Sequence, residues 1–323
     1  MIIAICLLVL GFVILIKGAD WLVDASSIIA RRLGITELTI GLTIVAFGSS
    51  LPELIVNVIS SSQGKADLAF SNILGSNIAN IFLILGATAL IAKIPVSKQT
   101  LRYEIPLTVL CTLVLLVLIQ DSYFNPTAQN LLSTADSLIL IAFFLIFMGY
   151  VAGTAREESD SEDETGDEQE NLLWQTGLVF VGLLCLFFGG QMVVNNAVTI
   201  ASLLGLSEAL IGLTIVAIGT SLPELAASAM AAKKGKTDIA VGNVIGSVLF
   251  NVLWVLGISG LIKELKPAGS LGIDFAIQLI SALLLMIFTV TNPRGFLLKW
   301  HGIAFLVCYF SYLLFHIVTE PSL

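Results

Sequence analysis

The stretch GLTIVAFGSSLPEL at residues 41–54 returns as GLTIVAIGTSLPEL at residues 212–225. The likeness continues without a gap, so residues 41–86 align with residues 212–257 at a constant offset of 171 residues. Of the 46 aligned positions, 22 are identical. An internal repeat of this length predicts a molecule built from two related halves.

The composition is that of a membrane protein. Of the 323 residues, 57% are hydrophobic and 12% are charged, and the mean hydropathy is +1.00. Apolar runs recur with lengths of about 20 residues, which an α-helix needs to cross the hydrocarbon core of a bilayer. We therefore predict an all-α polytopic membrane protein with ten transmembrane helices. The predicted spans are residues 2–30, 36–62, 67–91, 103–120, 135–155, 172–202, 207–232, 238–262, 273–290 and 300–318.

An acidic stretch, REESDSEDETGDEQE at residues 156–170, separates the two repeats. It holds nine of the 23 aspartates and glutamates of the chain. Such a run is typical of a solvated, disordered linker, with a regulatory ion sensor as the alternative. We expect an N-terminal five-helix repeat in residues 1–155, an acidic cytoplasmic linker in residues 156–171 and a C-terminal five-helix repeat in residues 172–323.

Lysine and arginine predict the orientation in the membrane. If the N-terminus lies outside, the cytoplasmic loops hold eleven of these residues and the external loops hold three, with Lys17 inside the first span. Because cytoplasmic loops are enriched in positive charge, this orientation is favoured. Both termini then face outward from the plasma (inner) membrane. Five spans per half is an odd number, so the second half is expected to be inverted, with equivalent residues facing each other near the midplane.

The residue content argues against several kinds of site. The four cysteines, Cys6, Cys111, Cys185 and Cys308, lie in apolar runs without CxxC spacing and are expected to be buried packing residues. Both histidines lie in the last segment, which leaves no ligands for a His-rich zinc site. The sequence contains neither an HExxH motif nor a nucleophile–base pair, so these patterns do not indicate an enzyme.

Each repeat places one glutamate, Glu53 or Glu224, inside an apolar run. An ionisable group at membrane depth is costly and is by default a functional candidate. The preceding residue, Pro52 or Pro223, lacks an N–H and crowds the carbonyl one turn earlier, so it should break the helix. The freed carbonyls are tolerated where protein or an aqueous cavity satisfies them. We predict a cation site that is built from both halves.

The helix after each glutamate carries polar residues at positions i, i+4 and i+8. These are Asn72, Ser76 and Asn80 in the first repeat and Asn243, Ser247 and Asn251 in the second. For Asn72 and Asn243, hydrogen bonding between helices and ion binding are equally open alternatives. Gly75 and Gly246 are expected to let neighbouring helices approach closely.

Other charged residues suggest local roles. Asp67 and Asp238 each follow a Gly-Lys pair and are expected to cap the helix that begins there. Lys17, Asp20 and Asp24 lie along the first span at i, i+3 and i+7. There we expect an internal ion pair or a hydrated surface, with a gating role as the alternative.

The predicted donors are carboxylates, hydroxyls and backbone carbonyls, all of which are hard oxygen ligands. Ca²⁺ takes about six to eight oxygens at roughly 2.3–2.6 Å, and two carboxylates balance its charge. Na⁺ binds the same class of donor and could compete at one site. Softer metals would require cysteine or histidine, which the repeats do not place there.

With these motifs the chain resembles the calcium/cation antiporter superfamily, specifically prokaryotic sodium/calcium exchanger-like proteins. The resemblance rests on G-[ST]-S-L-P-E followed by G-x-x-x-x-N, present twice and five predicted spans apart. It implies ten helices in two inverted halves with a cytoplasmic loop after the fifth. It also implies that the first and sixth spans, residues 2–30 and 172–202, slide across a core bundle to expose the site alternately.

The resemblance further implies the ion ligands. Glu53 and Glu224 would bind calcium with their carboxylates, helped by backbone oxygens of Ser49 and Thr220. The implied sodium ligands are the hydroxyls of Ser50, Ser221, Ser76 and Ser247 and the carbonyls of Ala46 and Ala217. Asn80 and Asn251 would lie at the middle of the site. Several family members have an aspartate at the position of Asn251, which leaves the coupling to Na⁺, H⁺ or K⁺ open.

We therefore predict a secondary active antiporter that exchanges Ca²⁺ for Na⁺ by alternating access at a midplane carboxylate site. A proton-coupled cation/Ca²⁺ antiporter is the alternative, because glutamates also carry protons, and a passive channel is a further one. The expected partners are Ca²⁺ and Na⁺ as substrates and the lipid bilayer. We expect no enzymatic activity, no cofactor, no nucleic acid and no obligate protein partner.

Overall fold

A computed structural model describes residues 1–124, 129–159, 171–205, 215, 217–267, 271–292 and 295–319. Almost all of these residues are helical, which confirms the predicted all-α class. A short antiparallel pairing joins β1 (Ile94–Pro95) to β2 (Phe296–Leu297).

Six helices run without a break of direction over most of their length. They are α1 (Ile2–Arg32), α7 (Ile105–Ile119) with the preceding π-helical η3 (Thr100–Glu104), α9 (Thr134–Ser159), α10 (Leu172–Leu203), α16 (Gly272–Val290) and α17 (Lys299–Thr319). A short helix, α8 (Asp121–Phe124), follows α7. The bounds agree with the predicted spans to within a few residues.

The two repeats form segments that change helical type or direction. The first repeat comprises α2 (Glu37–Ile40), η1 (Gly41–Val45), α3 (Ala46–Ser49), α4 (Leu51–Ser62), α5 (Ala66–Ile78), η2 (Ala79–Leu85) and α6 (Gly86–Ile91). The second comprises α12 (Ala217–Thr220), α13 (Leu222–Lys233), α14 (Thr237–Phe250), η5 (Asn251–Val255) and α15 (Leu256–Ile262).

Within the described residues, eight helices are long and apolar enough to span a membrane, and the bent segment Glu37–Ser62 makes a ninth. The remaining predicted span, residues 207–232, begins in a stretch outside the described residues, and α12 and α13 are its described part. The structure is therefore that of a polytopic helical membrane protein.

The segments 66–91 and 237–262 form the centre of the molecule. Their most apolar windows are 83% and 78% buried, against 22–39% for the other long helices. Glycines allow the close packing: a Cβ on Gly246 would lie 2.7 Å from the Leu42 carbonyl oxygen, and one on Gly242 would lie 2.7 Å from the Leu38 carbonyl oxygen. In contrast, no atom of the described residues beyond the backbone of its own helix lies within 4 Å of a Cβ added to Gly75, so of these two glycines only Gly246 shows the predicted close approach.

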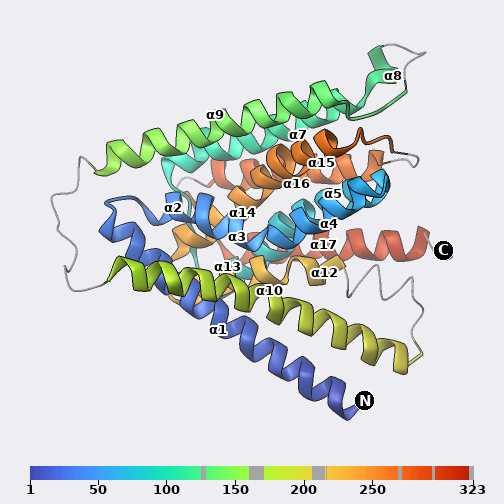
Figure 1. The fold of residues 1–323 in the computed structure, drawn as a ribbon. Helices are drawn as coiled ribbons and strands as arrows, with labels where there is room; N and C mark the ends of the chain where they lie inside the picture. The colour runs from blue at the N-terminus through green and yellow to red at the C-terminus, as the bar shows by residue number, and fades with distance from the viewer. Residues whose placement is uncertain are drawn as a thin grey trace.

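The long helices α1 and α10 lie side by side and antiparallel (Figure 1). Gly11 packs against Gly189, and Gly18 packs against Gly182. A Cβ added to Gly18 would lie 2.6 Å from the Cβ of Cys185, which real Cβ atoms essentially never show. Small residues of this kind let membrane helices approach with their backbones in contact.

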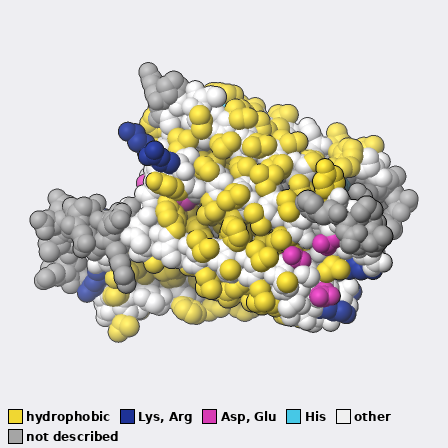
Figure 2. Space-filling model, turned by 90° about the horizontal axis from the view of Figure 1, so that it is seen from above, with side chains coloured by type: hydrophobic (Ala, Val, Ile, Leu, Met, Phe, Trp, Pro, Cys, Tyr) yellow, Lys and Arg dark blue, Asp and Glu magenta, His cyan; other side chains and the backbone are white. Residues whose placement is uncertain are grey.

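Apolar side chains cover the outer surface. Figure 2 shows hydrophobic side chains across the middle of one face, with most of the visible charged groups toward its two ends. This is the pattern expected when the middle of the molecule faces lipid. The helix α1 begins and α17 ends on one side of the molecule, whereas α9 ends and α10 begins on the opposite side (Figure 1).

Two local predictions are wrong. Asp67 and Asp238 lie in the first turns of α5 and α14, but the N-cap residues are Lys65 and Lys236, and neither helix has a side-chain cap. A carboxylate in the first turn still interacts favourably with the positive end of a helix. Of the four cysteines, only Cys111 is buried: Cys6 is exposed on the outer face of α1, and Cys185 and Cys308 are partly exposed. All four are free.

Candidate functional site

Each repeat breaks its helix immediately before the glutamate. In the first repeat α3 ends at Ser49, Ser50 has φ −85° and ψ 9°, and the following helix α4 is bent away by 47°. In the second, Ser221 has φ −89° and ψ 8°. The proline occupies the first turn of the new helix, where its missing N–H costs no intrahelical bond. The predicted breaks are thus present in both repeats.

This geometry places both glutamates in the first turn of a helix. Glu53 is in the first turn of α4 and Glu224 is in the first turn of α13. The N-terminus of a helix carries a partial positive charge from its unpaired N–H groups. The backbone therefore offers partial compensation to a carboxylate that lies inside an apolar region.

Serine hydroxyls contact both glutamates, and two of the serine contacts cross from one repeat to the other. Both glutamates are 0% exposed. Ser50 Oγ donates to Glu224 Oε1 at 3.1 Å, and Ser76 Oγ donates to Glu53 Oε1 at 3.1 Å. The Ser76 and Ser221 hydroxyl oxygens are 3.4 Å apart. Residues more than 140 positions apart in the sequence therefore form one polar cluster.

Several buried polar atoms of this cluster have no hydrogen-bond partner among the described residues. They are Glu53 Oε2, Glu224 Oε2, Ser247 Oγ, Asn251 Oδ1 and both amide atoms of Asn80. Buried polar groups are nearly always satisfied, because leaving one without a partner costs a few kcal/mol. No ion pair joins either glutamate to a lysine, arginine or histidine in the described part of the chain. The cluster has the chemistry of a site that binds a cation.

The donors are almost entirely oxygen. The described residues contain no group of three or more histidine, cysteine, aspartate or glutamate side chains that could hold a metal. Two carboxylates with neutral oxygens suit a hard cation such as Ca²⁺ or Na⁺ better than a softer metal.

Two asparagines lie where their helices become π-helical. Asn80 is the second residue of η2 and Asn251 is the first residue of η5. Asn251 Nδ2 donates to Asn77 Oδ1 at 3.1 Å and to Ser76 Oγ at 3.5 Å. Short π-helical turns are frequent at functional sites, because the extra residue releases backbone groups from the regular ladder. The sequence pattern did not predict these turns.

Asn72 and Asn243 make hydrogen bonds between helices. Asn243 Nδ2 donates to the Glu224 carbonyl oxygen at 3.3 Å and to Ser228 Oγ at 2.9 Å, and its Oδ1 accepts from Ser49 Oγ at 3.0 Å. Asn72 Nδ2 donates to the Glu53 carbonyl oxygen at 3.4 Å. Of the two open alternatives, these contacts support interhelical hydrogen bonding.

The partners Asn57 and Ser228 were not predicted from the sequence. Asn57 Oδ1 accepts from Asn72 Nδ2 at 2.7 Å, and Asn57 Nδ2 donates to the Ala69 carbonyl oxygen at 3.2 Å and to Ser259 Oγ at 3.3 Å. Asn57 and Ser228 each follow a glutamate by four residues, so they share its helical face. The spacing of four residues from each glutamate was the sequence signal that could have identified Asn57 and Ser228.

The remaining predicted ligands lie at the helix breaks. Ser49 Oγ donates to the Ala46 carbonyl oxygen at 3.3 Å as well as to Asn243, and the same carbonyl accepts from the Ser50 N–H at 3.1 Å. Thr220 is the last residue of α12 and is partly exposed. Ala217 begins α12, and its side chain lies outside the described set.

A cavity of about 240 Å³ extends to these breaks. It is lined by Pro52, Thr220 and Pro223 from the repeats and by Gln191 and Asn195 from α10, among others. The cavity therefore reaches the helix breaks that precede the two glutamates, and polar side chains of α10 form part of its wall.

The family model described as sodium/calcium exchanger protein matches residues 3–153 and 174–318. The chain belongs to the sodium/calcium exchanger family. It is 39% identical to the putative antiporter CaxA of Alkalimonas amylolytica over 90% of this chain and 91% of that protein. It is 32% identical to the sodium/calcium exchanger MaX1 of Methanosarcina acetivorans, over 95% of this chain and 96% of that protein.

The fold is similar to that of a solved structure of the sodium-calcium exchanger NCX_Mj, with a TM-score of 0.82 and 30% sequence identity. The alignment covers 97% of this chain and 98% of that chain. The resemblance found in the repeat motifs is therefore confirmed over nearly the whole chain. An ion-transporting membrane protein is the coarse functional class that follows.

Proposed function

We propose that this protein is a secondary active antiporter that exchanges Ca²⁺ for Na⁺ across the plasma (inner) membrane by alternating access. The observation that carries the proposal is the pair of fully buried glutamates without a cationic side-chain partner in the described residues, with serine contacts that cross from one repeat to the other. A bound cation supplies the missing positive charge. The known relatives named sodium/calcium exchangers support the same pair of substrates.

In this proposal the ligands come from both repeats. Glu53 and Glu224 hold Ca²⁺, with backbone oxygens of Ser49 and Thr220. The Na⁺ ligands are the hydroxyls of Ser50, Ser221, Ser76 and Ser247 and the carbonyls of Ala46 and Ala217, with Asn80 and Asn251 at the middle. The partnerless oxygens of the glutamates, Ser247 and Asn251 support this set.

The transport step needs no covalent chemistry. Either one Ca²⁺ or several Na⁺ would neutralise the two carboxylates, and only a neutralised site crosses the low-dielectric centre cheaply. Ten spans in two inverted halves would place the glutamates near the midplane, with both termini outside and the acidic linker in the cytoplasm. The common side of the first and last helix ends supports an even number of crossings.

Counter-ion dependence in a reconstituted system tests the proposal. Purified protein in liposomes loaded with Na⁺ should take up ⁴⁵Ca²⁺ when the external Na⁺ is removed, and uptake should saturate. Uptake that follows a pH gradient and ignores Na⁺ would instead establish the proton-coupled alternative. Flux that needs no counter-ion and shows unitary conductance would establish a channel.

Conservative variants test the assigned residues in the same assay. Glu53→Gln and Glu224→Gln keep the shape of the side chain and remove its charge, so each should abolish Ca²⁺ uptake in a folded protein. Glu264→Gln is the matched control, because Glu264 is exposed and lies between α15 and α16. Near-native uptake by either buried-site variant would remove that glutamate from the calcium site.

A further inference from the structure

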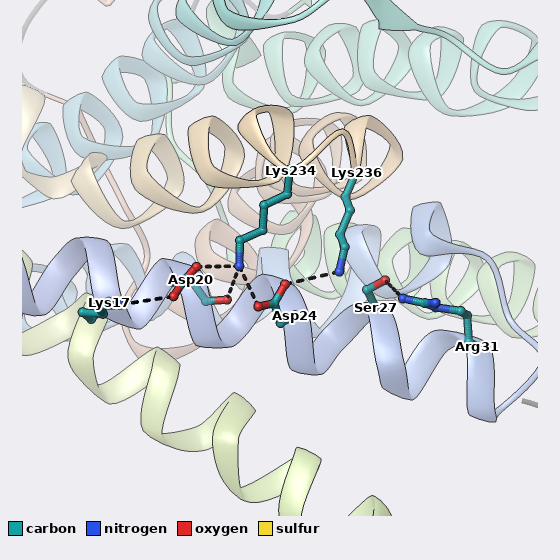
Figure 3. A network of polar contacts seen from close by, with 7 residues as sticks. All are labelled: Lys17, Asp20, Asp24, Ser27, Arg31, Lys234 and Lys236. Carbon is teal, nitrogen blue, oxygen red and sulfur yellow. Dashed lines mark hydrogen bonds and ion pairs between the residues drawn. The ribbon is translucent and has the colours of Figure 1, made fainter. Parts of the chain in front are cut away.

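The second half of α1 is joined by ion pairs to the turn between α13 and α14 (Figure 3). Lys234 Nζ lies 2.5 Å from Asp20 Oδ1 and 2.7 Å from Asp24 Oδ2, and it also donates to the Asp20 carbonyl oxygen at 3.1 Å. Lys236 Nζ lies 3.4 Å from Asp24 Oδ1. The sequence predicted an ion pair for the acids of α1 but not these partners.

This network differs from an isolated surface ion pair. The side chains of Lys234 and Lys236 are only 21% and 18% exposed, and Asp20 is 28% exposed. Lys234 contacts both aspartates, and Lys17 lies 3.6 Å from Asp20. Networks of partly buried charges contribute more than single exposed pairs, whose contribution is often close to zero. These contacts therefore hold α1 against the second repeat.

The equivalent positions of the other repeat carry no such set of charges. The glycines of α1 and α10 correspond at the offset of the repeat, with Gly11 matching Gly182 and Gly18 matching Gly189. At this offset Asp20, Asp24 and Lys234 correspond to neutral residues, which are Gln191, Asn195 and Gln63. Only Lys236 keeps a charged counterpart, Lys65. The ionic contact can thus form on one side of the molecule alone.

The neutral residues Gln191 and Asn195 of α10 also lie beside a cavity. Because α1 and α10 are antiparallel, Asp20 and Asp24 lie toward one end of this helix pair, and Gln191 and Asn195 lie toward the other. Gln191 and Asn195 line the cavity of about 240 Å³ that extends to Thr220. The ion pairs lie toward the end where α9 ends and α10 begins.

We propose that Asp20, Asp24, Lys234 and Lys236 form a one-sided ionic lock, which keeps the path to the site closed at the end where α9 ends and α10 begins. The lock rests on the proposed alternating access, because it requires two conformations in which the site opens at opposite ends of the molecule. A contact that exists in only one of two conformations shifts their ratio by its own free energy. Breaking the lock should therefore populate the opposite opening without any change at the glutamates.

The test is a labelling rate, which requires neither Na⁺ nor Ca²⁺ gradients. Ser26→Cys, in a protein whose native cysteines are replaced by alanine, places a thiol at a fully buried position of α1 close to the lock. A membrane-impermeant thiol reagent should modify it about tenfold faster when Lys234→Met is added. A tenfold change corresponds to about 1.4 kcal/mol between the two conformations. Lys233→Met is the matched control, because this exposed neighbour lies in the same turn of the chain.

Charge exchange separates a lock from a general loss of structure. Because Lys234 and Lys236 both pair with Asp24, all four charges are exchanged together: Asp20→Lys and Asp24→Lys with Lys234→Asp and Lys236→Asp. This variant should return the labelling rate toward that of the unmodified lock, and it stays informative if Lys234→Met fails to fold. Gln63→Lys with Gln191→Asp and Asn195→Asp installs the charges on the other side and should also accelerate labelling of Ser26→Cys. An unchanged rate with Lys234→Met, an equal rise with Lys233→Met, or no effect of the charge exchange would overturn the proposal.

The result is distinguishable from the outcome of the transport assay. If labelling responds to Lys234 but ⁴⁵Ca²⁺ uptake ignores Na⁺, the lock stands and the assignment of the coupled ion fails. If uptake follows Na⁺ but labelling is unchanged, the exchanger stands and the lock is rejected.

Discussion

Replacing Asn57 with alanine should destabilise the protein about three times as much as replacing its counterpart Ser228 with alanine. Both side chains are 0% exposed, and each receives a hydrogen bond from the asparagine that also contacts a glutamate carbonyl. Asn57 makes two further hydrogen bonds, to the Ala69 carbonyl oxygen and to Ser259 Oγ. The perturbation therefore removes three bonds in one repeat and one bond in the other.

The magnitude follows from the value of such bonds in membrane proteins, which average about 0.6 kcal/mol. Asn57→Ala should lower the free energy of unfolding by about 2 kcal/mol, and Ser228→Ala should lower it by about 0.6 kcal/mol. Asn57→Ser retains a hydroxyl that can accept from Asn72 and should give an intermediate loss.

Reversible unfolding in mixed micelles with increasing sodium dodecyl sulfate measures these differences, with helical circular dichroism as the signal. The comparison is between variants of one protein under one condition, so the reference state is shared. Equal losses for Asn57→Ala and Ser228→Ala would refute the reasoning, because they would show that the additional bonds of Asn57 contribute nothing.

Two other predictions use the same reconstituted protein. Asn251→Asp adds a third carboxylate beside Asn77 Oδ1 and Ser76 Oγ. Ca²⁺ should therefore bind more tightly at alkaline pH, and ⁴⁵Ca²⁺ uptake should depend more steeply on pH. An unchanged pH profile of uptake would contradict this prediction. A Cβ at Gly18 would lie 2.6 Å from the Cβ of Cys185, so Gly18→Leu should push α1 away from α10. The free energy of unfolding should fall by about 1–3 kcal/mol or more. A value equal to that of the unaltered protein would show that the close approach is not required.

The helix bounds could be predicted because the bilayer imposes a length on every apolar run. The predicted span 238–262 is observed as Thr237–Ile262, and the predicted first span ends two residues before the structure ends α1 at Arg32. The position of the breaks also followed from the sequence, since Pro52 and Pro223 cannot continue a regular helix.

The sequence predicted that the two repeats meet, but it could not predict which side chains pair between them. Ser49 bonds to Asn243 across 194 positions, and Lys234 contacts Asp20 across 214. These partners depend on the packing of whole helices, which local patterns do not describe. The caps assigned to Asp67 and Asp238 failed for another reason: the N-cap of each helix lies two residues earlier, at Lys65 and Lys236.

The differences between the repeats have a thermodynamic consequence under the proposed mechanism. If two inverted halves were identical, the conformations open to either side would be equivalent by symmetry, and the chain itself would give neither of them a lower free energy. Glu53 and Glu224, the proposed calcium ligands, are such identical positions and cannot create a preference. A preference must come from positions that differ, as Lys234 differs from Gln63. Lys234 adds a charge that is paired on one side only, so it contributes directly to the free-energy difference between the two conformations.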